Sequence, residues 1–131
     1  MIQRLLIVDE SPFVRAALHD MLNHLSYEVE SSCNKNEALE LFKGCKGERK
    51  FDAVIIEFED MHDNVTNNIL SEIRNIDQNI KTIALGTKFC SKFLSNFTDY
   101  GFNAVLVKPF KLDELLFTLK FIEEPSQLQN S

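Results

Sequence analysis

The chain has 131 residues, of which 44% are hydrophobic and 26% are charged, the composition of one ordinary globular domain that buries its own core. Its net charge of −6, with no run of five or six Lys or Arg, argues against direct binding of nucleic acid. Three cysteines lie far apart without a CxxC or Cys/His pair, which argues against a disulfide framework and a zinc site. No apolar run approaches the roughly 18 residues of a membrane span. We therefore expect a cytoplasmic protein with no membrane partner.

Apolar runs of strand length alternate along the chain with segments of helical spacing. The runs predict five strands, at residues 4–8, 27–31, 53–57, 82–86 and 104–107. The segments that follow them predict helices at residues 12–25, 36–46, 67–75, 88–100 and 112–122. This alternation is typical of a parallel sheet covered by helices on both faces. We expect a single domain over residues 1–123, followed by a polar tail or the start of a linker at residues 124–131.

Carboxylates and one lysine follow three of the predicted strands. Asp9 and Glu10 come after the first strand, Glu57 ends the third with Glu59 close behind, and Lys108 follows the fifth. In an open α/β sheet the functional crevice lies beyond the carboxyl ends of the strands, so we expect these side chains to meet there. Clustered acids repel one another unless a cation lies among them, which Lys108 or a divalent metal could supply. A solvated acidic rim with a structural Lys–carboxylate pair fits the spacing equally well.

Three segments resemble the receiver domains of response regulators in two-component signalling. Residues 5–15 (LLIVDESPFVR) are similar to the family's opening segment, in which an acidic pair after the first strand holds Mg²⁺. Residues 51–57 (FDAVIIE) resemble the strand that leads to the phosphoacceptor aspartate. Residues 101–110 (GFNAVLVKPF) resemble the closing strand and its Lys-Pro-Phe motif, in which Pro109 would follow a cis peptide bond. The resemblance implies an α/β, flavodoxin-like (βα)5 fold, a doubly wound parallel sheet with the strand order 2-1-3-4-5.

The departures from the family fall on the residues that carry its phosphorylation chemistry. Glu57 stands where the family has the aspartate that accepts phosphate from a histidine kinase, and its extra methylene moves the carboxylate about 1.5 Å outward. Gly86 stands where the family has a Thr or Ser hydroxyl, although a shift of one residue would bring in Thr87. Val105 replaces the family's switch Tyr or Phe. Because phosphoryl transfer depends on positioning, these departures from the family that the chain resembles predict an atypical receiver that signals without phosphate.

The loop after the third predicted strand bears on the metal. Residues 58–64 lack the proline and glycine that the family usually has there, and one backbone carbonyl of that loop binds Mg²⁺ in the family. Mg²⁺ tolerates misplaced ligands badly, although the acidic pocket of Asp9, Glu10, Glu57 and Glu59 could still attract it. We therefore expect either no cofactor or weak binding of Mg²⁺. Lys108 is most simply a counter-ion for the carboxylates.

A surface must provide the output if phosphate is not the input. Receivers generally contact partners or dimerise through the fourth helix, fifth strand and fifth helix. The fifth predicted helix carries leucines on one face and Phe117 and Phe121 on another, so these two side chains are either doubly buried or open to a partner. Phe89, Phe93 and Phe97 recur every four residues and are expected to face the core. The expected partner is a histidine kinase, an output protein or a second copy of the chain.

Other functions share parts of this pattern. A flavin-binding relative would need a phosphate-cradling loop after the first strand, and the Glu-Ser-Pro sequence there is no such loop. A phosphatase with Asp9 as nucleophile would need a second acid where Ser11 stands, and no nucleophile is paired with a base, so we expect no enzyme. The stronger alternative is a functional receiver that is phosphorylated, with Mg²⁺, on an unorthodox acid such as Glu57, Asp9 or Asp60.

Overall fold

The computed structural model describes residues 1–59 and 64–124. Strands and helices alternate through these two ranges: β1 (Arg4–Val8), α1 (Pro12–His24), β2 (Glu28–Ser32), α2 (Lys35–Gly44), the 3-10 helix η1 (Gly47–Arg49), β3 (Ala53–Glu57), α3 (Asn64–Ile76), β4 (Lys81–Gly86), α4 (Ser91–Asn96), β5 (Ala104–Val107) and α5 (Leu112–Glu123). No helix within these two ranges has the length and apolar character needed to cross a membrane. The polar tail predicted from residue 124 falls outside the described residues from 125 onward.

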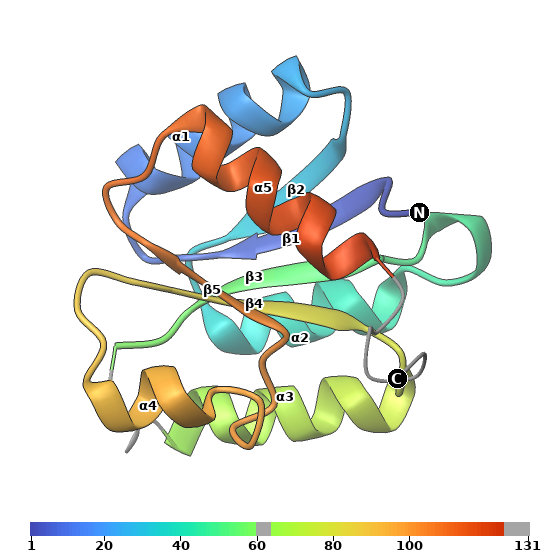
Figure 1. Cartoon of the computed structure of the whole chain (residues 1–131). Coiled ribbons are helices and arrows are strands. Elements are labelled where there is room, and N and C mark those ends of the chain that lie inside the picture. The colour runs from blue at the N-terminus through green and yellow to red at the C-terminus, as the bar shows by residue number, and fades with distance from the viewer. Residues whose placement is uncertain (60–63, 125–131) are drawn as a thin grey trace.

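The five strands form one parallel sheet with the order β2-β1-β3-β4-β5. Helices α1 and α5 cover one face of this sheet, and α2, α3 and α4 cover the other (Figure 1). The predicted flavodoxin-like architecture and its strand order 2-1-3-4-5 are therefore confirmed. Because every strand runs the same way, the carboxyl ends of all five lie along one edge of the sheet.

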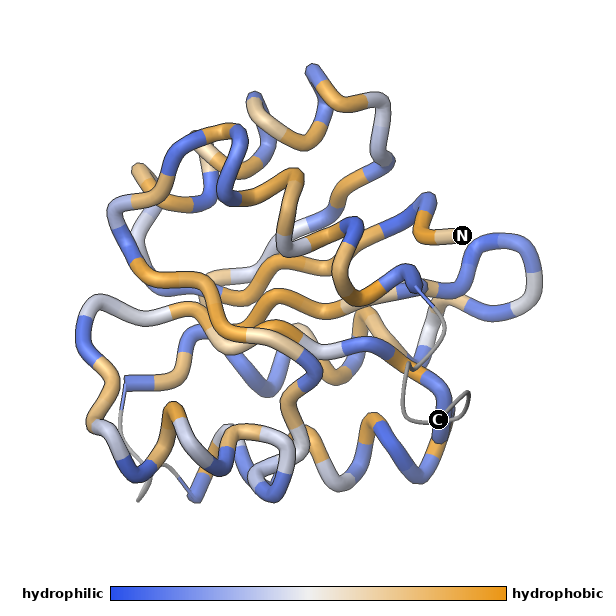
Figure 2. The backbone as a smooth tube through the Cα atoms, viewed as in Figure 1, coloured by the Kyte–Doolittle hydropathy of each residue, from blue (hydrophilic) through white to orange (hydrophobic). Residues whose placement is uncertain are grey.

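The core is divided by the sheet into two apolar layers. Alternate strand residues point to opposite faces, so Leu6, Val54 and Ile56 join the layer under α2, α3 and α4. Leu5 and Ile7, one position away, join the layer under α1 and α5. The central strands β1, β3 and β4 are accordingly among the most continuously hydrophobic stretches of the chain (Figure 2). Burial of each such side chain stabilises the fold by about 1.5–3 kcal/mol, which is why the sheet is fixed in register.

The helices depart from prediction mainly at α4. The apolar spacing predicts a helix over residues 88–100, but α4 spans only Ser91–Asn96. Its first turn begins after Cys90, whose backbone is extended, with φ −72° and ψ 159°. After Phe97 the chain turns, because the amides of both Tyr100 and Phe102 donate to the Phe97 carbonyl. Gly101 then takes a φ of +93°, which favours glycine and leads the chain into β5.

Candidate functional site

Lys108 brings together carboxylates from two other strand ends. Its Nζ atom lies 3.1 Å from Asp9 Oδ2, 3.5 Å from Glu57 Oε2 and 3.7 Å from Glu59 Oε1. The sheet sets this geometry, since β1 pairs with β3, β3 with β4, and the Lys108 amide donates to the Gly86 carbonyl at 2.7 Å. The structure thus places three of the predicted acidic residues, Asp9, Glu57 and Glu59, around the ammonium group of Lys108.

Asp9 and Lys108 form the buried centre of this cluster. The Asp9 side chain has no exposed surface, and the Lys108 side chain is 13% exposed. The second carboxylate oxygen of Asp9, Oδ1, accepts a 2.8 Å hydrogen bond from the Ser11 amide. Burial by itself lowers the pKa of Lys108, but its hydrogen bond to Asp9 and the surrounding negative charge outweigh burial and raise that pKa. Lys108 is therefore a positively charged ammonium at neutral pH.

Glu57 and Glu10 face a polar cleft beside this cluster. The Glu10 amide donates to Glu57 Oε1 at 3.4 Å, and the Glu10 side chain is exposed. The cleft has a volume of about 310 Å³ and lies between the ends of β1 and β3 and the start of α2. Its lining is Val8, Asp9, Glu10, Cys33, Asn34, Lys35, Asn36, Glu57 and Val65. The structure brings Glu10 to the cleft, whereas the hydrogen bond and ion pairs of Lys108 run to the three other acids.

These carboxylates do not fit a magnesium ion in the arrangement they adopt. Both oxygens of Asp9 are engaged, one by Lys108 and one by the Ser11 amide, and both oxygens of Glu57 have a partner. Glu59 is turned toward Thr87. In residues 1–59 and 64–124, no group of three or more His, Cys, Asp or Glu side chains is arranged to hold a metal. The ammonium of Lys108 already supplies the cation that the clustered acids need.

Gly86 has no room for a side chain. A Cβ atom built on it would lie 2.7 Å from Phe89 Cζ and 2.9 Å from the Phe58 carbonyl oxygen. Thr87, one residue further, is exposed and donates its hydroxyl to Glu59 Oε2 at 3.0 Å. Val105 is half-buried and packs against the core layer under α4. Of the two residues that could correspond to the family's hydroxyl, Gly86 has no space for a side chain and Thr87 donates its hydroxyl to Glu59.

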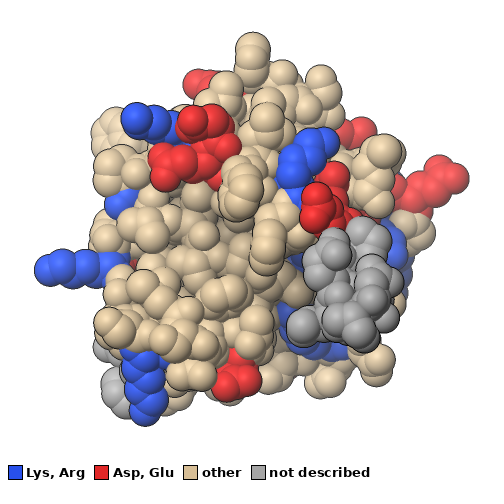
Figure 3. All heavy atoms as spheres, in the orientation of Figure 1, with Lys and Arg blue, Asp and Glu red and all other residues tan. Residues whose placement is uncertain are grey.

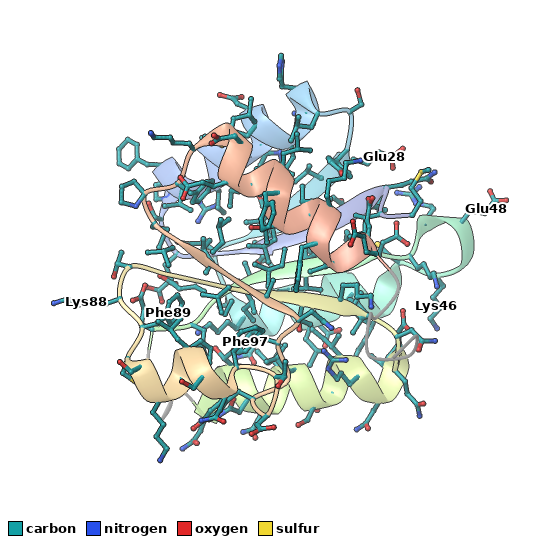
Figure 4. The ribbon with its side chains drawn as sticks, in the orientation of Figure 1. Glu28, Lys46, Glu48, Lys88, Phe89 and Phe97 are labelled. Carbon is teal, nitrogen blue, oxygen red and sulfur yellow. The ribbon has the colours of Figure 1, made fainter. Side chains whose placement is uncertain are left out.

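An aromatic cluster underlies the segment after β4. Phe93 is buried, and Phe89 and Phe97 are half-buried against the same layer, as the spacing predicted. The Phe89 ring stacks on Phe93 at 5.1 Å, and Phe93 contacts Phe58 at 5.1 Å. Figure 4 shows Phe89 and Phe97 on the side of α4 toward the sheet, while Lys88 points away from the molecule. The contact of Phe89 with Gly86 was not predicted, because the spacing shows which face a residue takes and not which neighbour it meets.

A second cleft lies on the other side of Lys108. It has a volume of about 370 Å³ and is formed by the start of α1 and the segment after β5. Its lining is Phe13, Val14, Ala17, Met21, Thr87, Lys108, Pro109 and Phe110. The Lys108–Pro109 peptide bond in this wall is cis.

Several apolar side chains are exposed on α4, β5 and α5. On α5, Leu115 and Leu119 are fully buried, whereas Phe117 is 71% and Phe121 is 55% exposed. Exposed apolar residues of the neighbouring elements, together with those two phenylalanines, make up what we call the α4–β5–α5 face: Leu94, Val107, Leu112, Phe117 and Phe121. Figure 3 shows the side of the molecule that carries α5 and β5, with uncharged atoms over its centre and charged groups mainly toward its margins. Of the two alternatives for Phe117 and Phe121, burial on both faces of the helix or exposure, the structure shows exposure.

Known proteins are similar to this chain over nearly its whole length. The family model of the response regulator receiver domain matches residues 5–120. The chemotaxis protein CheY4 of Vibrio cholerae is 25% identical, with a TM-score of 0.78 over 93% of this chain and 99% of that one. The response regulator TrrA of Thermotoga maritima, solved in complex with Mg²⁺ and BeF, is 28% identical, with a TM-score of 0.72 over 92% and 99%.

A third structure shares the fold at lower identity. The receiver domain of a sensor histidine kinase from Pseudomonas aeruginosa, solved with a magnesium ion in its active-site cleft, is 23% identical, with a TM-score of 0.72 over 95% of this chain and 100% of that one. No curated protein sequence matches the chain significantly.

Proposed function

This chain belongs to the response regulator receiver family, and on that premise we propose that it is a protein-interaction module of two-component signalling whose output does not depend on phosphorylation. Receiver domains are generally signalling modules without enzymatic activity of their own, and they interact with histidine kinases or output domains. The observation that carries the proposal is the closed position at Gly86, where the Phe89 ring and the Phe58 carbonyl occupy the space of any side chain. A hydroxyl has no place there to contact a phosphoryl group.

The surroundings of Glu57 support the same proposal. Its carboxylate lies 3.5 Å from Lys108 and accepts the Glu10 amide, so it is held as one partner of an ion-paired network. Phosphoryl transfer needs a nucleophile in line with the phosphorus and charges already in place around it. A carboxylate that reaches one methylene further than aspartate is displaced from that geometry. Glu57, with Asp9 and Lys108, is more simply a structural ion-paired group.

Magnesium is not required by the proposed function. The receivers of Thermotoga maritima and Pseudomonas aeruginosa were solved with Mg²⁺, so weak binding of Mg²⁺ is the alternative for this chain. Mg²⁺ demands near-ideal octahedral geometry, and it would have to displace the Lys108 ammonium from Asp9. We infer that the site works with its own lysine as cation.

The α4–β5–α5 face is the proposed output surface. Phe117 and Phe121 expose most of their side chains, although their helix already buries leucines on its core side. An exposed apolar patch of this kind marks an interaction site more often than scattered exposed residues do. The proposed occupant is a histidine kinase, an output protein or a second copy of the chain.

Intact-mass measurement after incubation with Mg²⁺ and acetyl phosphate tests the proposal. The wild-type chain is expected to keep its mass, because Glu57 is ion-paired and Gly86 offers no hydroxyl. A gain of one phosphoryl group would instead support a functional receiver with an unorthodox acceptor. Peptide mapping would then choose between Glu57, Asp9 and Asp60, the last of which lies outside the described residues.

The Glu57→Asp variant separates the acceptor from the rest of the switch. It restores the family's acceptor but leaves Gly86 and Val105 unchanged, so we expect no phosphorylation-dependent change in oligomeric state. Light scattering with and without acetyl phosphate measures this. Full phosphorylation-dependent dimerisation of this single variant would contradict the proposal.

A further inference from the structure

The carboxylate of Glu59 joins the ends of three strands. Glu59 lies two residues beyond β3, Thr87 directly follows β4, and Lys108 directly follows β5. The Thr87 amide lies 3.3 Å from both oxygens of Glu59, and the Thr87 hydroxyl donates to Oε2 at 3.0 Å. Lys108 Nζ lies 3.7 Å from Oε1. Three donors, one of them charged, therefore converge on a single side chain.

The backbone segments that carry Glu59, Thr87 and Lys108 are positioned by hydrogen bonds at the strand ends. The Phe58 amide donates to the Leu85 carbonyl at 2.9 Å, and the Lys108 amide donates to the Gly86 carbonyl at 2.7 Å. The three backbone segments are thus tied to the sheet on the strand side of the contact, and Glu59 meets them where the strands end. An isolated surface ion pair contributes little because two long side chains must be ordered for it. Here a backbone amide and a hydroxyl next to a strand end supply most of the contact, and hydrogen bonds to an ionised acceptor are the stronger kind.

The segment that Glu59 contacts leads directly to α4. Thr87 is two residues before Phe89, whose ring closes over Gly86 and stacks on Phe93 of α4 at 5.1 Å. The position of Thr87 therefore affects where the Phe89 ring lies. Because Glu59 is part of the same chain, its contact with Thr87 is intramolecular and has a high effective concentration, whereas a free anion binds only when it is present in solution.

We propose that Glu59 is a built-in anion that holds residues 87–90 in one conformation and so fixes Phe89 and the start of α4. The contact takes the place of a ligand that would come and go, and the chain holds this conformation constitutively. Only its last consequence, that a fixed α4 keeps the α4–β5–α5 face ready for a partner, rests on the proposed function. The order of residues 87–90 itself does not.

Amide hydrogen exchange of the isolated chain, followed by NMR, tests the proposal. In Glu59→Ala the amides of residues 87–90 are expected to exchange about three- to tenfold faster, the effect of losing about one net hydrogen bond. Glu59→Gln keeps the acceptor oxygen without the charge and should give a smaller increase. Thr87→Val removes the hydroxyl but keeps the shape and the amide, and the double variant Glu59→Ala with Thr87→Val should exchange no faster than Glu59→Ala.

Glu48→Ala is the matched control. Glu48 is an exposed glutamate on η1, at the opposite end of the molecule from Phe89 (Figure 4), so its loss should leave residues 87–90 unchanged. Unchanged exchange in folded Glu59→Ala would overturn the proposal. If Glu59→Ala does not fold, unchanged exchange in both Glu59→Gln and Thr87→Val overturns it equally. The exchange experiment contains no phosphodonor and no partner, so its result does not depend on the proposed function. Phosphorylation of the wild-type chain in the intact-mass experiment would contradict the proposed function but not this inference.

Discussion

Single residues decide what the strand ends can do, and Gly86 is the clearest case. The ring of Phe89 and the carbonyl of Phe58 meet where its Cβ would be, at 2.7 and 2.9 Å. The Phe89 ring could rotate away, but the carbonyl belongs to the backbone that bonds β4 and cannot. Because of this close packing, the residues around Gly86 also exclude a hydroxyl-bearing side chain from this position.

Gly86→Ser is expected to lower the free energy of unfolding by about 1–3 kcal/mol, the usual effect of forcing extra atoms into a packed site. Urea unfolding measures it. Gly44→Ser is the control, because nothing lies within 4 Å of a Cβ on Gly44, and it should change stability by no more than about 0.5 kcal/mol. Equal stability of the two variants would show that the site at Gly86 is open and that a hydroxyl could be accommodated.

The approach of Asp9, Glu57 and Lys108 follows from the sequence, since each residue lies at the carboxyl end of a strand in a parallel sheet. Which oxygen meets which donor does not follow. The contact of Glu59 with Thr87 depends on the path of two loops and on side-chain rotamers, which spacing does not encode. The sequence signal for the Glu59–Thr87 contact was a threonine directly after one strand and acidic residues at the end of the neighbouring strand.

At the scale of elements, strands were easier to predict than helices. Strands β1, β3 and β5 have the predicted bounds, because short apolar runs end abruptly at charged or polar residues. Helix α4 has six residues where the pattern covers thirteen, since Phe97, Tyr100 and Phe102 continue the apolar spacing through a hydrogen-bonded turn. Aromatic side chains reach the core from a turn as readily as from a helix, so apolar spacing alone overestimated the helix.

Helix α5 presents two apolar faces that differ in burial. Phe117 lies two residues from both Leu115 and Leu119, about 200° away around the helix, so it points outward where they point inward. Phe121 lies one turn after Phe117 and two residues after Leu119, so it points outward as well. Folding alone leaves this second face uncovered.

Phe117→Ala and Phe121→Ala are each expected to change the free energy of unfolding by no more than about 0.5 kcal/mol, because the side chains are mostly exposed. Both should weaken capture of the partner, or self-association, in a pull-down matched against wild type. Leu119→Ala is the contrasting variant and should lower stability by about 2–5 kcal/mol, since Leu119 is fully buried. Binding that is the same in both phenylalanine variants and wild type would remove the α4–β5–α5 face as the output surface.

At the scale of the whole molecule, one edge of the sheet is cross-linked by the chain's own charges. Lys108 on β5's end contacts acids that follow β1 and end β3, and Glu59 adds the end of β4. Removing one partner of a buried pair leaves an uncompensated charge, so the cluster is stable only as a set. The ammonium of Lys108 therefore offsets part of the negative charge at this edge, in a chain whose net charge is −6.

Magnesium linkage tests this balance through the stability of the whole fold. A ligand that binds only the folded state adds RT ln(1 + [L]/Kd), or about 2.7 kcal/mol at one hundred times its Kd. We expect about 10 mM Mg²⁺ to raise the free energy of unfolding of the wild-type chain by less than about 0.5 kcal/mol, which corresponds to a Kd near or above that concentration. Lys108→Met removes the competing ammonium from Asp9, Glu57 and Glu59, so it should be less stable without Mg²⁺ and gain more from it. A gain near 2.7 kcal/mol in the free energy of unfolding of the wild-type chain would mean that Mg²⁺ displaces Lys108 readily. It would contradict the proposal that Lys108 serves as the cation of this site.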